Sequence, residues 1–189
     1  MAGYTIMVKE ILDEINSNSI THVFLQAGVG GMAAAMIAGF AKLSKNIPKF
    51  ITVEPENADC LFQSAVKGEP TVVHGDLDTV MAGLACGEVS LLAWSILESY
   101  VPHFMTIKDD SISKTMQLLA DRQTPIVAGE SAVAGLAGFL IASHDSSLKE
   151  ALKLDENSRI LVFGTEDDTD EKMYEKMVGR SAIEVLKGS

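Results

Sequence analysis

Residues 21–40 place three structural signals in direct succession: a short buried strand, a glycine-rich turn and a helix. The apolar run THVFLQ at 21–26 has the length and β-branched content of a buried strand. It leads into AGVGGM at 27–32, where apolar residues begin to recur at helical spacing. Such a unit is the building block of open parallel sheets, so it restricts the chain to the α/β class.

The rest of the chain continues this alternation of strands and helices. Further strands are expected at 49–53, 103–107 and 159–163, with a short edge strand at Val72 and Val73. Helices are expected at 3–17, 58–66, 91–100, 109–121, 131–144 and 171–178, besides the one after the glycine turn. We therefore predict one α/β domain over residues 1–189, a three-layer αβα sandwich with a mostly parallel central sheet.

The charge balance limits the partners. The chain has 26 acidic against 15 basic residues and a net charge of −11, which repels nucleic acid and anionic membrane surfaces. No apolar run approaches the roughly 20 residues of a membrane span, and the first residues do not resemble a signal peptide. We expect a cytoplasmic protein that binds neither nucleic acid nor membrane.

The glycine turn is a candidate phosphate site. Glycines let the backbone turn tightly and direct its amides at an anion near a helix N-terminus. Residues 28–33 also satisfy the G-x-G-x-x-A pattern of a dinucleotide site, and Glu54 ends the next strand, where a ribose-binding acid would lie. The turn alone therefore fits a nicotinamide dinucleotide as well as pyridoxal phosphate.

Three further segments carry a family resemblance: VEPENADC at 53–60, MAGLACGE at 81–88 and GTEDDTD at 164–170, supported by GES at 129–131. With the glycine turn they resemble the diaminopropionate ammonia-lyase family, within the tryptophan-synthase-like (fold type II) pyridoxal-phosphate enzymes. The similarity runs in unbroken order over residues 21–178. That extent is more specific than the glycine pattern and favours pyridoxal phosphate over a dinucleotide.

The resemblance implies a β-elimination that converts 2,3-diaminopropionate, a small amino acid, into pyruvate and ammonia, with the cofactor ring as electron sink. It assigns the cofactor phosphate to the amides of the glycine turn and the substrate side to the middle of the 81–88 segment. The residues are Gly28, Val29, Gly30, Gly31 and Met32 for the phosphate, and Ala82, Gly83 and Leu84 for the substrate side.

Two more residues receive roles from the resemblance. Glu130 matches an acid that the family places near the cofactor ring. The family's usual serine partner of the pyridine nitrogen corresponds to Gly164 here, so the adjacent Thr165 is nominated for that role. The family is dimeric, and a homodimer is expected. Threonine or serine dehydratases of the same fold, and a non-catalytic ligand-binding module, are the alternatives.

The family's Schiff-base lysine lies well before the glycine turn. Only 27 residues precede Gly28, and Lys9, the one lysine among them, falls on the polar face of an amphipathic helix. We therefore expect the chain to be the C-terminal part of a larger lyase, without a catalytic residue of its own and inactive alone. The missing N-terminal part of the enzyme would supply the amine.

Two remaining patterns receive structural interpretations. The acidic run EDDTDE at 166–171 lacks the glycine and distal glutamate of a calcium loop, so we predict a solvated loop that caps the next helix, and no metal site. Cys60 and Cys86 are expected to be separate reduced thiols. Because both belong to segments that the resemblance places near the active-site mouth, pairing under oxidation is the alternative.

Overall fold

A four-stranded sheet forms the centre of the computed structural model, which describes residues 3–15 and 19–187. The strands are β1 (His22–Gln26), β2 (Lys49–Pro55), β3 (His103–Ile107) and β4 (Ile160–Val162), in the order β3-β2-β1-β4. Every pairing is parallel, and β1 pairs with β2 and β4. The predicted mostly parallel sheet is confirmed, and its carboxyl ends lie along one edge.

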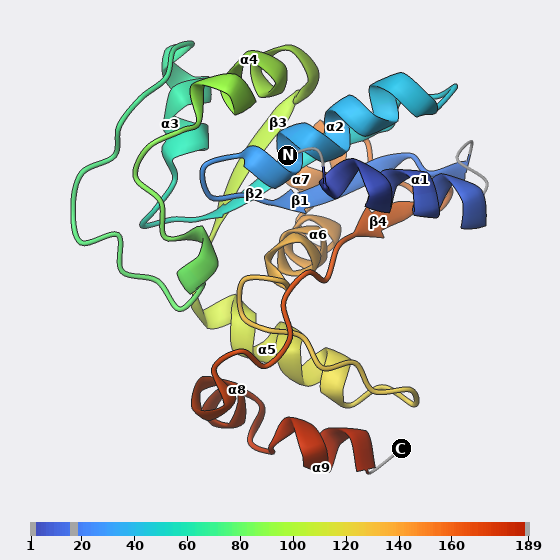
Figure 1. The fold of residues 1–189 in the computed structure, drawn as a ribbon, viewed down its shortest axis with the longest axis vertical. Helices are drawn as coiled ribbons and strands as arrows, with labels where there is room; N and C mark the ends of the chain where they lie inside the picture. Colours follow the sequence, from blue (N-terminus) through green and yellow to red (C-terminus); the bar gives the residue numbers. More distant parts are fainter. Residues whose placement is uncertain (1–2, 16–18, 188–189) are drawn as a thin grey trace.

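Helices cover both faces of the sheet, as the predicted sandwich requires (Figure 1). The α-helices are α1 (Tyr4–Glu14), α2 (Gly31–Leu43), α3 (Cys60–Lys67), α4 (Leu91–Tyr100), α5 (Asp110–Ala120), α6 (Ala134–His144), α7 (Ser146–Leu152), α8 (Glu171–Val178) and α9 (Ala182–Lys187). One core lies between the sheet and α1, α2 and α4. On the other face α6 packs on the strands, with α5, α8 and α9 outside it (Figure 1).

Small residues let α6 lie close to the sheet. A Cβ added at Gly138 would lie 2.8 Å from Val53 Cγ2, which leaves no room for a larger side chain. Beside it, Phe139 packs edge-on against Phe24 of β1, with ring centroids 5.6 Å apart. The alanine- and glycine-rich composition of this helix predicted such close packing, and the buried face of α6 confirms it.

The structure departs from the sequence prediction in a few elements. Val72 and Val73 form no strand: Val73 donates one backbone hydrogen bond to Gly87, within an irregular segment that holds Gly68, Pro70 and Gly75. The same segment contains a short 3-10 helix, η2 (Ala82–Leu84), which was not predicted. The short helices α7 and α9 were also missed, and α6 begins at Ala134 rather than at residue 131. Residues 16 and 17 of the first predicted helix lie outside the described residues.

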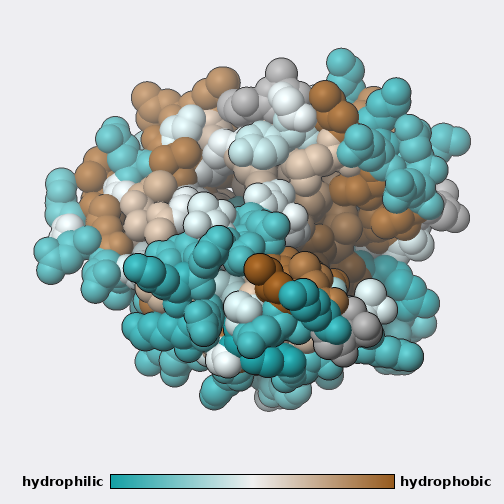
Figure 2. Space-filling view, turned by 60° about the horizontal axis from the view of Figure 1, so that its bottom comes forward, coloured by the Kyte–Doolittle hydropathy of each residue, from teal (hydrophilic) through white to brown (hydrophobic). Residues whose placement is uncertain are grey.

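Hydrophilic residues cover much of the surface (Figure 2). In Figure 2 the lower part of the molecule is mostly hydrophilic, with one compact hydrophobic group among the polar atoms. Such a distribution agrees with the excess of acidic residues. Within residues 3–15 and 19–187, no helix has the length and apolar content to cross a bilayer.

Candidate functional site

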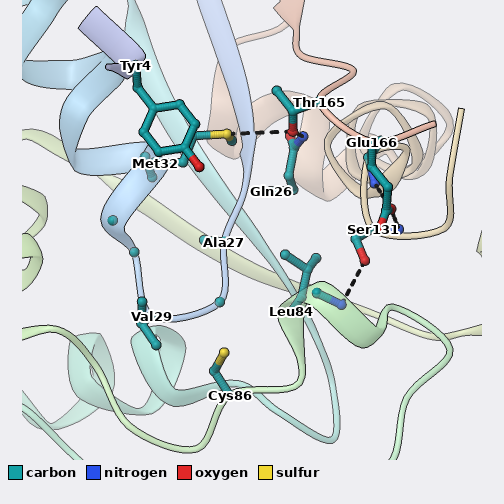
Figure 3. Close-up of a pocket in the computed structure, with 16 residues that line it drawn as sticks. Tyr4, Gln26, Ala27, Val29, Met32, Leu84, Cys86, Ser131, Thr165 and Glu166 are labelled. Carbon is teal, nitrogen blue, oxygen red and sulfur yellow. Dashed lines mark hydrogen bonds between the residues drawn. The ribbon is translucent and has the colours of Figure 1, made fainter. Parts of the chain in front are cut away.

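A cavity of about 450 Å³ opens where the carboxyl ends of β1 and β4 meet. Its walls come from the glycine turn and the start of α2, the 83–86 segment, residues 131–132 before α6, and residues 165–166 after β4 (Figure 3). Tyr4 of α1 reaches the same space. The cavity therefore lies where ligands bind in open parallel sheets, and it joins segments that are far apart in sequence.

Two glycines of the turn are required by its surroundings. Gly30 has a φ of 89°, a left-handed conformation, and a Cβ there would lie 2.7 Å from Leu97 Cδ1. A Cβ at Gly28 would lie 2.8 Å from Cys86 Sγ. A side chain at position 30 would be strained by its φ and would crowd Leu97, and one at position 28 would displace the Cys86 side chain.

The first turn of α2 offers free amide donors to the cavity. Gly30 is the N-cap and provides no side-chain cap, and the first turn carries no acidic residue. The initial N–H groups of a helix have no partner inside the helix. A Cβ added at Gly31 would meet no atom within 4 Å, and residues 26–33 all line the cavity. The predicted residues Gly28, Val29, Gly30, Gly31 and Met32 therefore lie together in the cavity wall, at a helix end where amide donors are available to a ligand.

A hydrogen-bonded network forms the opposite wall. Glu166 Oε2 accepts the amide hydrogens of Ser131 at 2.8 Å and Ala132 at 3.2 Å, while Ser131 Oγ accepts from the Gly83 amide at 3.0 Å (Figure 3). A Cβ at Gly129 would lie 2.6 Å from the same Glu166 oxygen. Glu166 therefore turns inward, which corrects the prediction that the acidic run is wholly solvated. The start of that run instead fixes the cavity wall.

The rest of the acidic run caps a helix as predicted. Asp170 Oδ1 accepts the amide hydrogen of Met173, which confirms its position as N-cap of α8. Glu171 follows in the first turn, where a negative charge is favoured by the helix dipole.

Thr165 lies in the cavity beside the end of β1. Its Oγ1 accepts from Gln26 Nε2 at 3.4 Å and donates to Met32 Sδ at 3.8 Å (Figure 3). β4 ends at Val162, so Thr165 is already beyond the strand and is free to turn into the cavity. Sequence reasoning selected Thr165 but missed Gln26.

The remaining predicted residues differ in their relation to the cavity. Gly83 and Leu84 line it, whereas Ala82 is not among its lining residues. Glu130 also lies outside the lining; it is buried with 8% exposed area. Burial raises the pKa of the Glu130 carboxyl, and the nearby charges of Glu166 and Asp170 raise it further.

Glu54 has a structural position that conflicts with the dinucleotide alternative. It is fully buried, and its two oxygens accept the amide hydrogens of Leu61 at 2.8 Å and Phe62 at 2.7 Å. Both acceptor oxygens are thus committed to the start of α3 rather than to a ribose. Burial outweighs these two hydrogen bonds and raises the pKa of Glu54 to about 8.

The two cysteines are free thiols on either side of the glycine turn. Cys60 donates to the Gly28 carbonyl oxygen with an Sγ–O distance of 3.7 Å, and Cys86 lines the cavity. The structure has the two thiols separate, and pairing under oxidation stays the alternative that thiol titration tests. Burial raises the pKa of the Cys60 thiol to about 12.

Lysines are absent from the cavity wall, and all lysines of the chain fall within the described residues. Lys9 is exposed on α1, as predicted, and borders a separate shallow hollow between α1 and α2. Among the described residues, the cavity thus combines the N-terminal end of α2, the Thr165 hydroxyl and a wall held by Glu166, and no lysine lines it.

Comparison with known proteins agrees with this geometry. The model of the family described as "Pyridoxal-phosphate dependent enzyme" matches residues 1–166. The chain belongs to the pyridoxal-phosphate-dependent enzyme family. Diaminopropionate ammonia-lyase of Salmonella typhimurium is 40% identical to this family member over 96% of the chain, and the Escherichia coli enzyme is 38% identical over 97%.

Solved structures of similar proteins share the fold. Holo diaminopropionate ammonia-lyase from Escherichia coli superposes with a TM-score of 0.82 at 35% identity, covering 93% of this chain and 46% of that one. Threonine deaminase isoform 2 from Solanum lycopersicum gives 0.77 at 22% identity, covering 94% of this chain and 48% of that one, a likeness of fold alone. The chain spans about half the length of the curated relatives it matches, 49% for both lyases.

Proposed function

We propose that this chain forms the phosphate-binding half of a pyridoxal-phosphate-dependent ammonia-lyase that converts 2,3-diaminopropionate into pyruvate and ammonia. The supporting observation is the uncapped N-terminus of α2, whose amides open into the cavity through Gly28 to Met32. Two relatives at 40% and 38% identity carry the name diaminopropionate ammonia-lyase. They favour this substrate over threonine or serine.

The hydrogen-bond donors in the cavity wall fit the phosphate group of the proposed cofactor. A phosphate monoester is an anion with several acceptor oxygens, and α2 offers donors with no side-chain carboxylate in its first turn. Gly28 lets the turn lie close to Cys86 in the cavity wall, and Gly30 lets it pack closely on Leu97 of the core. When bound, the cofactor supplies an electron sink for the carbanion formed at the substrate.

The chain's own residues then take distinct tasks. The amides of residues 28–32 would hold the phosphate, and Thr165 Oγ1 would serve as the partner of the pyridine nitrogen. Such a neutral partner would leave that nitrogen largely unprotonated, which suits an elimination better than a transamination. The 82–84 segment orients the substrate, and Ser131 holds that segment through the Gly83 amide. Glu130, whose pKa is raised by burial, would lie behind the cavity wall on the ring side.

The Schiff-base amine comes, in this proposal, from polypeptide outside these 189 residues. None of the chain's lysines lines the cavity. The lyase relatives have about twice the length of this chain, which leaves a second half to provide the amine. A cytoplasmic location and a homodimer complete the proposal.

Phosphate-dependent binding tests the site directly. Pyridoxine 5'-phosphate carries no aldehyde, so its binding needs no lysine. We expect the chain to bind it in a fluorescence titration, and to bind unphosphorylated pyridoxine and NADH at least 10-fold more weakly. Equal affinity for the phosphorylated and unphosphorylated forms would contradict the assignment of the phosphate to α2.

A single substitution sharpens that test. Gly31 has nothing within 4 Å of an added Cβ, so the Cβ of Gly31→Asp meets no neighbouring atom. A carboxylate there stabilises the helix N-terminus while repelling phosphate. We expect Gly31→Asp to abolish pyridoxine 5'-phosphate binding without lowering the melting temperature, and the neutral Gly31→Ser to retain most binding.

Catalysis provides the second test. The chain alone, given pyridoxal phosphate and 2,3-diaminopropionate, should release no pyruvate in a lactate-dehydrogenase-coupled assay. Pyruvate production by the chain would contradict an amine supplied from elsewhere. With an upstream half present, faster pyruvate formation from serine than from 2,3-diaminopropionate would favour the dehydratase alternative, and binding without any turnover would favour a non-catalytic module.

A further inference from the structure

We propose that Gln26 is a positioning residue that sets the direction of the Thr165 hydroxyl, so that its hydrogen points into the cavity. The inference rests on the proposed function and extends it by one residue. Gln26 ends β1 and is buried, with 4% of its area exposed, yet it reaches the cavity wall. No sequence motif marked this glutamine as functional.

The orientation of the Gln26 amide follows from its partners. Nε2 donates to the Phe163 carbonyl oxygen at 2.9 Å and to Thr165 Oγ1 at 3.4 Å. Among residues 3–15 and 19–187, Oε1 has no hydrogen-bond partner. The flipped amide would set Oε1 against the Phe163 carbonyl and lose that hydrogen bond, so the donor must face Phe163 and Thr165.

Helix α6 confines the other side of the amide. A Cβ added at Gly135 would lie 2.9 Å from the Phe24 carbonyl oxygen and 3.3 Å from Gln26 Oε1. Glycine at this position lets α6 approach the end of β1 closely enough to hold the glutamine side chain. Gln26 is thereby fixed between α6 and the residues that follow β4.

The fixed amide determines what Thr165 can offer. A hydroxyl carries one hydrogen and can accept and donate at once. Because Oγ1 accepts from Gln26, its own hydrogen is directed elsewhere, and the structure places Met32 Sδ 3.8 Å away as the acceptor (Figure 3). A thioether is a weak acceptor, so a pyridine nitrogen entering this space would replace it.

Gln26 is therefore suited to keep Thr165 a donor rather than an acceptor toward a ligand. A ring nitrogen that receives this hydrogen bond stays unprotonated. The glutamine thus favours the arrangement in which the Thr165 hydroxyl donates to an unprotonated ring nitrogen, and it does so without touching the ring.

Variants that differ in donor capacity test the inference. Gln26→Met keeps the side-chain length but removes the donor, and Thr165→Val removes the hydroxyl. Gln117→Met is the matched control, since Gln117 Nε2 also donates to a backbone carbonyl, that of Met177, far from the cavity. Pyridoxine 5'-phosphate labelled with ¹⁵N in the ring is titrated into each chain and into the double variant Gln26→Met/Thr165→Val, with inorganic phosphate as a second ligand.

We expect Gln26→Met and Thr165→Val each to weaken pyridoxine 5'-phosphate binding by about 3- to 10-fold, the usual range for one hydrogen bond. The double variant should be no weaker than either single one. In both single variants, the ¹⁵N resonance of the bound ring should shift toward the value that the ring nitrogen has when it accepts no hydrogen bond. Gln117→Met and Thr165→Ser should behave as the unsubstituted chain, and phosphate affinity should stay constant throughout.

Results that contradict the Gln26 inference can be told apart from results that contradict the proposed function. If Gln26→Met leaves affinity and the ¹⁵N resonance unchanged while Thr165→Val alters both, the Gln26 inference fails and the proposed function stands. Losses that multiply in the double variant also overturn it. If the unsubstituted chain binds neither pyridoxine 5'-phosphate nor phosphate, the proposed function fails first. Gln26→Glu adds a check, because an acceptor-only carboxylate would reverse the hydroxyl and should weaken binding further than Gln26→Met.

Discussion

Glu166 Oε2 accepts the Ser131 amide hydrogen at 2.8 Å and so ties the residues after β4 to the turn before α6. The same oxygen accepts the amide hydrogen of Ala132, and Ser131 Oγ accepts the amide hydrogen of Gly83. One carboxylate thus orders two walls of the cavity. Its removal should affect both the stability of the fold and the affinity for ligands in the cavity.

Glu166→Ala should therefore lower the free energy of unfolding by roughly 1–3 kcal/mol, because two partly buried amides lose their acceptor. Glu166→Gln retains one acceptor oxygen and should lose less. Urea denaturation followed by circular dichroism measures the change, with Glu156→Ala as control because Glu156 is exposed in a loop. An Ala variant as stable as the control would show that solvent replaces the carboxylate at no cost.

The sequence predicted the elements whose signals are local. α8 follows its N-cap Asp170, and β1 leads into the glycine turn and α2, as their residue patterns indicated. The contacts that complete the cavity are not local. Gln26 and Thr165 are 139 positions apart, and no periodicity connects them.

Other misses have equally physical reasons. Val72 and Val73 have strand-forming side chains, but neighbouring glycines and a proline keep this segment irregular. Glu166 belongs to an acidic run that suggests solvent exposure, and only the turn before α6 gives its carboxylate amide partners. In both cases the observed structure depends on tertiary packing, which the local sequence does not reveal.

The left-handed turn at Gly30 gives a second prediction. Gly30→Ala combines an unfavourable φ of 89° with a Cβ 2.7 Å from Leu97 Cδ1. Gly68→Ala is a matched control, since Gly68 has a φ of 74° but nothing within 4 Å. We expect Gly68→Ala to cost about 1–2 kcal/mol of unfolding free energy from backbone strain alone, and Gly30→Ala about 1–3 kcal/mol more.

Calorimetry or urea denaturation of the two variants separates strain from crowding. Gly30→Ala should also weaken pyridoxine 5'-phosphate binding, because the adjacent amides of α2 shift with it, whereas Gly68→Ala should not. Equal stability losses in the two variants would mean that Leu97 moves aside freely.

The buried Glu54 carboxyl predicts a pH dependence of stability. Its pKa is about 8 in the folded chain against 4.5 as the ordinary value. Below pH 4.5 the carboxyl is protonated in both states, so its stabilising contribution is complete. Between 4.5 and 8 only the unfolded chain ionises, and the contribution is progressively lost as the pH rises.

Glu54→Gln removes this ionisation and should flatten the profile. We expect the unfolding free energy of the unsubstituted chain to fall by roughly 2–5 kcal/mol more than that of Glu54→Gln between pH 5 and pH 9. Gln still loses one acceptor for the Leu61 and Phe62 amides, so the variant should be the less stable chain at pH 5. Urea titrations across this range give the profile, and Glu56→Gln, an exposed neighbour, is the control. Parallel profiles for the unsubstituted chain and Glu54→Gln would place the titrating group elsewhere.

The two thiols should differ in reactivity because their surroundings differ. Cys60 is buried with a pKa of about 12, so almost no thiolate forms at pH 8, whereas Cys86 is half-buried and lines the cavity. With Ellman's reagent the folded chain should show one accessible thiol, which Cys86→Ser removes, and a second only on unfolding, which Cys60→Ser removes. Pyridoxine 5'-phosphate should slow the first reaction, because a ligand in the cavity covers Cys86. Fewer than two thiols in the unfolded, unreduced chain would instead indicate that the cysteines pair across the glycine turn.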